Sequence, residues 1–279
     1  MMQTSLQDGT SEPAVDCEVP DEAEVYDDEA AGLDDDSRLT VVQTALHPIE
    51  DESAEWSMGV CWRAAAEISG DLANWATSPD GRFLTVTLGD VMGKGAPAGL
   101  LAAHLLGALD ALERESPAVA TDGAETAIRG RLERASAFAT LFHGRLQLCD
   151  GGLEFVDAGH GFAAIGRRDG EAERITSTDL PIGLQPSGMP RLPRHRMIGA
   201  GDVLLLASDG LLELPNASFD TLTTLAQHLA RCDDIAEALS DVVRAAPAVL
   251  EDDLTLLAVR RPTTSRRHDG SERPQEGRH

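Results

Sequence analysis

Five carboxylates of this chain stand beside glycine or beside another acid, at the ends of apolar stretches far apart in sequence. They are Asp71, Asp90, Asp209 and the pair Asp252–Asp253. Carboxylates at close range repel one another strongly unless something neutralises them. Hard divalent cations such as Mg²⁺ and Mn²⁺ prefer oxygen ligands and keep several waters. With no His or Cys near them in sequence, these acids favour a two-metal site, which could activate water for attack on a phosphoryl group.

Each acid also has an ordinary structural explanation when it is taken alone. Asp71 in Ser-Gly-Asp and Asp209 in Ser-Asp-Gly fit turn or helix-cap positions. Asp80, in Asp-Gly, is interpreted as a turn residue only. The joint placement of the other acids at strand ends is what favours a metal site.

Other motifs with known chemistry are not matched. Residues 89–95, Gly-Asp-Val-Met-Gly-Lys-Gly, superficially resemble a phosphate-binding loop, but the spacing is one residue short and Gly95 follows Lys94. We therefore interpret Lys94 as a surface or turn lysine. The acid spacing of an EF-hand and the Gly-x-Ser-x-Gly elbow of serine hydrolases are not met either.

One stretch, Phe83–Leu109, is expected to hold Asp90 rigidly. It begins with alternating apolar and small polar residues, the period-two pattern of a half-buried strand. Asp90 then falls just past the strand end, in a glycine-rich turn. A helix is expected from Ala96–Pro97, because proline suits the first helical turn and apolar residues follow at helical spacing.

The remaining pattern predicts an α+β fold with antiparallel sheets covered by helices. Asp-Gly within 78–82 and the turn at 149–152 indicate hairpins. We expect helices at 39–47, 121–136 and twice within 218–246; strands at 56–65, 139–148, 153–158, 162–167, 172–177, 203–210 and 251–261; a turn at 69–75; and a proline-rich loop at 181–193.

Composition separates a central region from two tails. Residues 1–38 are rich in Asp and Glu, which predicts a disordered acidic arm, and 262–279 form a second tail without apolar anchors. Residues 39–261 then make one domain. A net charge of −25 and a pI near 4.5 argue against nucleic acid as a partner. The longest apolar run is too short for a membrane span, and the four scattered cysteines suit a reducing cytoplasm.

The order of seven motifs along the chain resembles a known family, the metal-dependent PPM-type (protein phosphatase 2C-like) serine/threonine phosphatases. More narrowly, it is similar to their bacterial SpoIIE/RsbU branch, over nearly all of residues 45–261. The resemblance implies two stacked antiparallel sheets flanked by helices on both faces. The motifs are SGD, GDVMGKGAPAGLLAA, FATLFHGRL, FVDAGH, LPIGL, GDVLLLASDGLLE and DDLTLLAVR.

The resemblance also implies roles for the acids. Asp71 matches the first metal-binding acid, and Asp90 matches the acid that bridges two metal ions. Val91 matches the position at which the family offers a backbone carbonyl as a ligand. Asp209 and Asp252 match the remaining metal-binding acids.

Two further positions have weaker parallels, and one segment departs from the family. Asp253 stands where relatives often carry Asp or Asn, so we expect a supporting residue. His160, in Asp-Ala-Gly-His, matches a family motif, either as an acid or orienting group near the site or as a turn-stabilising residue. Leu72-Ala73-Asn74 occupies positions at which relatives usually carry aromatic residues and a second acid.

The function implied by the resemblance is hydrolysis of phosphoserine or phosphothreonine in a protein, with two Mn²⁺ or Mg²⁺ ions and no protein nucleophile. In this branch the usual substrate is a phosphoserine on an anti-sigma-factor antagonist of a partner-switching pathway. Regulation is expected from a separate sensor or activator protein or from the acidic arm. Two alternatives stay open: a non-catalytic phosphatase-like module that sequesters a signalling partner, and a hydrolase of a small phosphorylated molecule.

Overall fold

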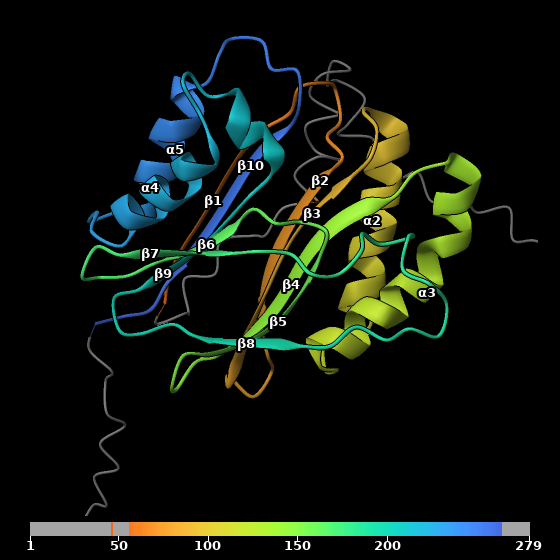
Figure 1. Cartoon of the computed structure of the whole chain (residues 1–279), viewed down its shortest axis with the longest axis horizontal. Helices are drawn as coiled ribbons and strands as arrows, with labels where there is room; N and C mark the ends of the chain where they lie inside the picture. The colour runs from red at the N-terminus through yellow and green to blue at the C-terminus, as the bar shows by residue number, and fades with distance from the viewer. Residues whose placement is uncertain (1–45, 47–55, 264–279) are drawn as a thin grey trace, which may run out of the picture.

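Two antiparallel sheets of five strands each lie face to face and are covered by helices on both outer faces (Figure 1). The computed structural model describes residue 46 and residues 56–263. The expected acidic arm, the expected helix at 39–47 apart from Leu46, and most of the second tail lie outside these residues. The two-sheet α+β architecture predicted from the sequence is confirmed.

The strand order explains how distant segments come together. The first sheet has the order β1-β10-β9-β6-β7, so the last strand pairs with the first, and the second sheet has the order β2-β3-β4-β5-β8. The first sheet contains β1 (Ser57–Arg63), β6 (Ala163–Gly166), β7 (Ala172–Ile175), β9 (Val203–Ala207) and β10 (Leu254–Arg260). The second contains β2 (Asp71–Thr77), β3 (Phe83–Val91), β4 (Ala139–Gln147), β5 (Gly152–Ala158) and β8 (Arg194–Met197).

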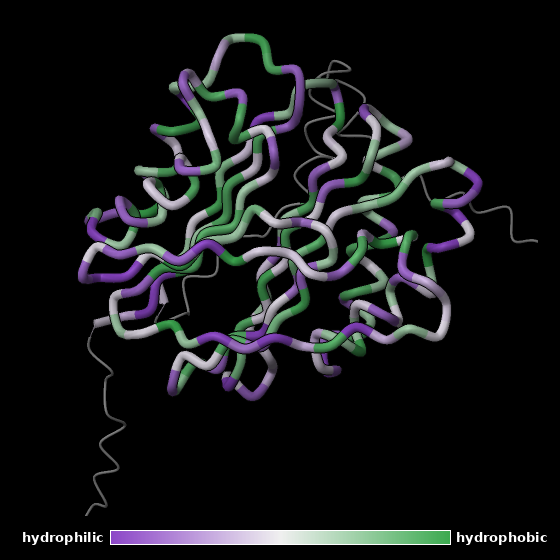
Figure 2. The backbone as a smooth tube through the Cα atoms, in the orientation of Figure 1, coloured by the Kyte–Doolittle hydropathy of each residue, from purple (hydrophilic) through white to green (hydrophobic). Residues whose placement is uncertain are grey.

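The core between the sheets follows from the alternation of side chains along each strand. Leu84, Val86 and Leu88 of β3 are fully buried and belong to the same cluster as Leu257 and Leu204 of the first sheet. Figure 2 shows the corresponding apolar colour along the central strands. This inner face matters for function, because acids of both sheets lie at one end of it.

In the described part of the chain, four α-helices cover the outer faces in pairs. Helices α2 (Ala96–Asp110) and α3 (Pro117–Ala135) pack on the second sheet, while α4 (Phe219–Leu229) and α5 (Ile235–Ala245) pack on the first (Figure 1). Pro97 lies in the first turn of α2, as predicted. Within the described part of the chain, no helix combines the length and apolar character that a bilayer crossing requires.

Three expectations about local structure need correction. The turn predicted at 69–75 is wrong from Asp71 onward, because Asp71–Thr77 form strand β2 and pair with β3 over seven residues. Asp90 lies inside β3, as its next-to-last residue, rather than past its end. Strand β8 was not predicted, because its sequence Arg-His-Arg-Met is polar without apolar alternation (Figure 2).

A buried ion pair fixes the long connection between β7 and β8 on helix α3. The side chain of Arg191 is fully buried and pairs with Glu125, which is 2% exposed. Arg191 also binds Asp122 Oδ1 at 3.1 Å, and Glu125 Oε1 accepts from the backbone N–H of Gly183 at 3.0 Å. These contacts attach the connection to the helix at several points.

We predict that Glu125→Ala destabilises the fold by about 3–5 kcal/mol, because it leaves the buried Arg191 charge with only the more exposed Asp122 as an acidic partner. Urea denaturation followed by circular dichroism measures this change. Glu133→Ala is the matched control, since Glu133 is exposed on the same helix, and its cost should stay within about 0.5 kcal/mol. Equal effects of the two substitutions would contradict the prediction.

Candidate functional site

Asp71 and Asp90 face each other across the β2–β3 hairpin. The antiparallel register places the two residues directly opposite, at the end of the sheet remote from the hairpin turn. Side-chain alternation directs both toward the inner face, on which Ala73 and Leu88 pack. Like charges directly opposite each other destabilise a strand pair. The second sheet therefore carries a destabilising pair of carboxylates, which lies at the edge of the core.

The first sheet brings its acids to the same end through β9 and β10. Asp209 begins a 3₁₀ helix, η2 (Asp209–Glu213), directly after β9, and Asp252–Asp253 precede β10. Ser208 links the two strands: its Oγ donates to the carbonyl of Asp253 at 2.9 Å and accepts from Thr255 N at 2.8 Å. The acids after β9 and before β10 are thereby neighbours.

The pKa values show that acids of both sheets act on one another. The pKa of Asp90 is raised to about 7, first by burial and then by the charges of Asp209, Asp252 and Asp253. The pKa of Asp71 is raised well above its usual value by burial and by Asp90. The structure therefore brings together all five acids that were predicted from the sequence.

Asp253 is held by backbone groups at both of its carboxylate oxygens. Its Oδ1 accepts from Ala65 N at 2.7 Å and its Oδ2 accepts from Gly70 N at 2.9 Å, while the residue is only 3% exposed. Asp253 thus holds the segment that leads from β1 into Asp71. This arrangement favours the supporting role expected for it.

Glycine at position 70 allows the backbone of β3 to approach this segment closely. A Cβ at Gly70 would lie 2.6 Å from the carbonyl oxygen of Val91 and 3.5 Å from Asp90 Oδ1. The carbonyl of Val91 and the carboxylate of Asp90 therefore border the same small space. Val91 N also donates to the carbonyl of Gly70 at 3.1 Å, which fixes the two segments together.

Sequence reasoning missed Glu213, which holds the loop before β10. Its Oε2 accepts from Glu251 N at 2.7 Å, and its Oε1 accepts from the backbone N–H of Asp252. Glu213 ends η2, so this carboxylate connects the segment that carries Asp209 to the one that carries Asp252. No local signal marks such a residue, because its partners lie almost forty residues away in sequence.

The residues of this site fit divalent cations by their chemistry. Asp71 Oδ2 is buried and has no hydrogen-bond partner, which is costly for a carboxylate oxygen. Within the described residues, no group of three or more His, Cys, Asp or Glu side chains is arranged to hold a metal ion by itself. Mg²⁺ needs fewer than three protein ligands, since it keeps several waters and binds through one or two carboxylates. Mn²⁺ has a similar preference for carboxylate oxygen and water.

The hydrogen bond of His160 links it to a turn and not to the acid cluster. Its backbone N–H donates to Asp157 Oδ1 at 2.8 Å, and Gly161 N donates to the same atom at 3.1 Å. Burial lowers the pKa of His160 to about 4, so its ring is neutral at pH 7. These contacts favour the turn-stabilising interpretation of His160 over an acid near the site.

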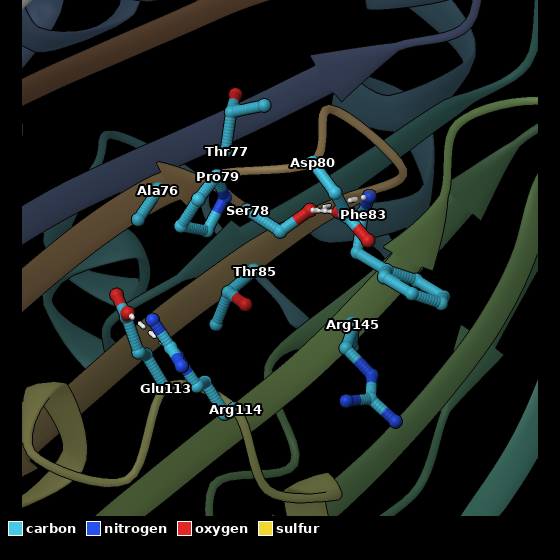
Figure 3. A pocket seen from close by; sticks show the side chains of 10 residues that line it. All are labelled: Ala76, Thr77, Ser78, Pro79, Asp80, Phe83, Thr85, Glu113, Arg114 and Arg145. Atoms are coloured by element: carbon cyan, nitrogen blue, oxygen red, sulfur yellow. Dashed lines mark hydrogen bonds and ion pairs between the residues drawn. The ribbon is translucent and has the colours of Figure 1, made fainter.

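A well-formed cavity of about 320 Å³ lies at the opposite end of the β2–β3 hairpin (Figure 3). Groups that line it contact one another: Ser78 Oγ donates to Asp80 Oδ1 at 2.7 Å, and the Arg145 guanidinium lies over the Phe83 ring, 4.9 Å from its centroid. None of the five clustered acids lines it. The cavity is therefore separate from the candidate site.

We predict that Asp90→Asn stabilises the metal-free protein at pH 7.5 by roughly 1–3 kcal/mol, since each pKa unit corresponds to about 1.4 kcal/mol. Because the folded-state pKa of Asp90 is raised to about 7, the wild type loses stability as pH rises from about 4 to 7. Thermal unfolding in EDTA at pH 5 and pH 7.5 should show a smaller pH effect in the variant.

Asp233→Asn is the control for this prediction, because Asp233 is exposed in the connection between α4 and α5. It removes one negative charge away from the cluster and should leave the pH effect as in the wild type. A variant Asp90→Asn that is no more stable than the wild type at pH 7.5 would contradict the prediction.

Comparison with known proteins identifies relatives of the whole sandwich. The family model of stage II sporulation protein E (SpoIIE) matches residues 79–262. The chain is 23% identical to the phosphoserine phosphatase RsbU of Bacillus subtilis (strain 168) over 235 residues. This match covers 79% of the chain and 68% of RsbU.

Solved structures share the fold. The RsbU and RsbW domains of Rv1364c from Mycobacterium tuberculosis superpose with a TM-score of 0.64 at 25% identity, over 75% of this chain and 61% of that one. This chain therefore spans less than two thirds of that structure. The catalytic domain of the serine/threonine protein phosphatase PstP, solved with two manganese ions, gives a TM-score of 0.56 at 19% identity, over 74% and 97% of the chains. This chain shares the fold of solved PP2C phosphatase domains, and since the SpoIIE model matches more than half of the sequence, this protein belongs to the SpoIIE family.

Proposed function

We propose that this protein hydrolyses phosphoserine or phosphothreonine on a regulatory protein. The observation that carries the proposal is the convergence of acids from both sheets at one end of the inter-sheet core. Burial, and after it the charges of Asp209 and Asp252 of the other sheet, raise the pKa of Asp90 to about 7. Such a concentration of charge destabilises the fold, and it is expected where the chemistry of a site requires it.

Asp253, whose two carboxylate oxygens both bind backbone N–H groups, is assigned a different role from the other four acids. Asp71, Asp90, Asp209 and Asp252 would hold two Mn²⁺ or Mg²⁺ ions through carboxylate oxygens, with the backbone carbonyl of Val91 beside them. Asp253 would position Asp71 instead, since its own oxygens bind backbone N–H groups. When bound, the cations supply positive charge for the phosphoryl oxygens and an activated water. The chain itself then needs no nucleophilic side chain.

The proposed substrate is a phosphorylated regulatory protein, namely an anti-sigma-factor antagonist in a partner-switching pathway. Similarity to RsbU, whose name describes a phosphoserine phosphatase, and to a chain that carries RsbU and RsbW domains supports this proposal. We propose further that a separate sensor or activator protein regulates the enzyme. A cytoplasmic setting accords with the free thiols of Cys61, Cys149 and Cys232.

Hydrolysis assays test the activity. The purified chain with Mn²⁺ should release phosphate from p-nitrophenyl phosphate and, with a higher kcat/KM, from a phosphorylated antagonist protein. Asp209→Asn should lower kcat/KM by about 10³-fold, because loss of a charge-stabilising ligand costs several kcal/mol at the transition state. Asp233→Asn should match the wild type. Preference for free phosphoserine over the phosphoprotein would favour the small-molecule alternative, and inactivity on all substrates would contradict the proposal.

Calorimetric titration with Mn²⁺ tests the cation sites without turnover. We predict that the wild type binds two ions and that Asp90→Ala loses most of this binding, because Asp90 would contact both. Asp233→Ala should bind as the wild type does. An absence of Mn²⁺ binding by the wild type would favour a non-catalytic binding module.

A further inference from the structure

Lys94 is the only lysine of the whole chain, whereas arginine is common. It stands four residues after Asp90, in the short loop between β3 and α2. The loop is fixed at both ends: Met92 N donates to the carbonyl of Phe138 at 2.9 Å, and Gly95 N donates to that of Ile68 at 3.0 Å. The backbone therefore places this lysine beside the acid cluster.

The ammonium group of Lys94 interacts with the cluster directly. Lys94 Nζ lies 3.9 Å from Asp252 Oδ1, and the two side chains are 51% and 46% exposed. Its charge also acts on Asp90: it lowers the pKa of this acid, against the larger upward effects of burial and of the neighbouring acids. Lys94 thus pairs with Asp252 beside the first sheet and acts electrostatically on Asp90 of the second.

Arginines do not share this position. In the described residues, every ion pair that an arginine forms is with an acid outside the cluster, such as Arg167 with Asp202 or Arg191 with Glu125. Lys94 is therefore the cation that this part of the chain pairs with the five acids.

The pairing of Lys94 with Asp252 is one that a ligand can replace. An ion pair between half-exposed side chains contributes only about 0–1 kcal/mol. Gly93 and Gly95, with φ of 116° and 70°, flank the lysine, and a Cβ at Gly95 would meet no atom within 4 Å. The lysine side chain can accordingly turn from Asp252 toward a ligand above the cluster while its backbone stays fixed.

A phosphate monoester that enters this site meets a strongly negative surface. A lysine ammonium is a compact charge with three donors, suited to phosphoryl oxygens. We propose that Lys94 leaves Asp252 and binds a non-bridging oxygen of the substrate's phosphoryl group, as a substrate-binding residue. This inference rests on the proposed function and replaces the interpretation of Lys94 as a mere turn lysine.

Steady-state kinetics on the phosphoprotein with Mg²⁺ test the proposal. Lys94→Gln should raise KM by about 10–100-fold, since a charge-assisted hydrogen bond is worth roughly 1.5–3 kcal/mol, and should change kcat less. Lys94→Arg should restore much of the affinity. Arg82→Gln is the control, because Arg82 is an exposed cation of the β2–β3 turn that pairs with Asp80. A KM unchanged in Lys94→Gln would overturn the proposal.

A single lysine also allows a direct measurement that does not depend on turnover. Reductive methylation with ¹³C-formaldehyde retains the charge and gives one lysine signal, with the N-terminal amine as an internal reference. Titration of the Mg²⁺-loaded full chain with inorganic phosphate should shift the Lys94 signal and leave the reference unchanged. An unmoved Lys94 signal at phosphate concentrations that inhibit the enzyme would overturn the proposal.

The two measurements separate this inference from the proposed function. If the wild type hydrolyses the phosphoprotein and Lys94→Gln keeps the same KM, only the proposed role of Lys94 is contradicted. The proposed function then stands. A wild type without hydrolysis, but with a Lys94 signal that moves with phosphate, would contradict the phosphatase and support phosphate binding. Absence of both effects would overturn both.

Discussion

The repulsion between Asp71 and Asp90, directly opposite each other on β2 and β3, is the constraint on which the rest of the site depends. Seven paired residues and the buried side chains of Val86 and Leu88 hold the hairpin in this register. A slip of one residue would turn every inward side chain toward the helices. The apolar core between the sheets therefore keeps both carboxylates on the inner face, against their mutual repulsion.

Hydrogen bonds hold the segments of the first sheet that carry acids of the site. Ser208 joins the end of β9 to the start of β10, and Glu213 accepts two backbone N–H groups from the loop before β10. The carboxylate of Asp253 accepts hydrogen bonds from two backbone N–H groups in the segment that precedes Asp71. Asp253 thus connects this end of the first sheet to the segment that leads into β2.

Local sequence patterns were sufficient for elements whose partners lie nearby. Alternation predicted β3, Asp-Gly predicted the turn before Phe83, and the proline at 97 marked the start of α2. Ser-Gly-Asp before β2 gives a turn signal, yet pairing with β3 makes Asp71 the first residue of a strand. The sequence pattern indicated the acids at strand ends. It could not indicate Glu213 or the close approach of Gly70 to Val91, because both depend on segments distant in sequence.

The distribution of cations explains how such a negative end can accept an anionic substrate. Arginines fix segments away from the acid cluster: Arg191 holds a long connection on α3, and Arg261 donates to the carbonyl of Ile198 at 3.0 Å. These planar groups form several hydrogen bonds each, which suits the fixing of loops. Near the acids the chain places a single flexible ammonium group instead, that of Lys94. Among the residues that the structure describes, this group forms one weak ion pair. It can therefore exchange its partner, whereas an arginine bound by several acceptors could not do so at comparable cost.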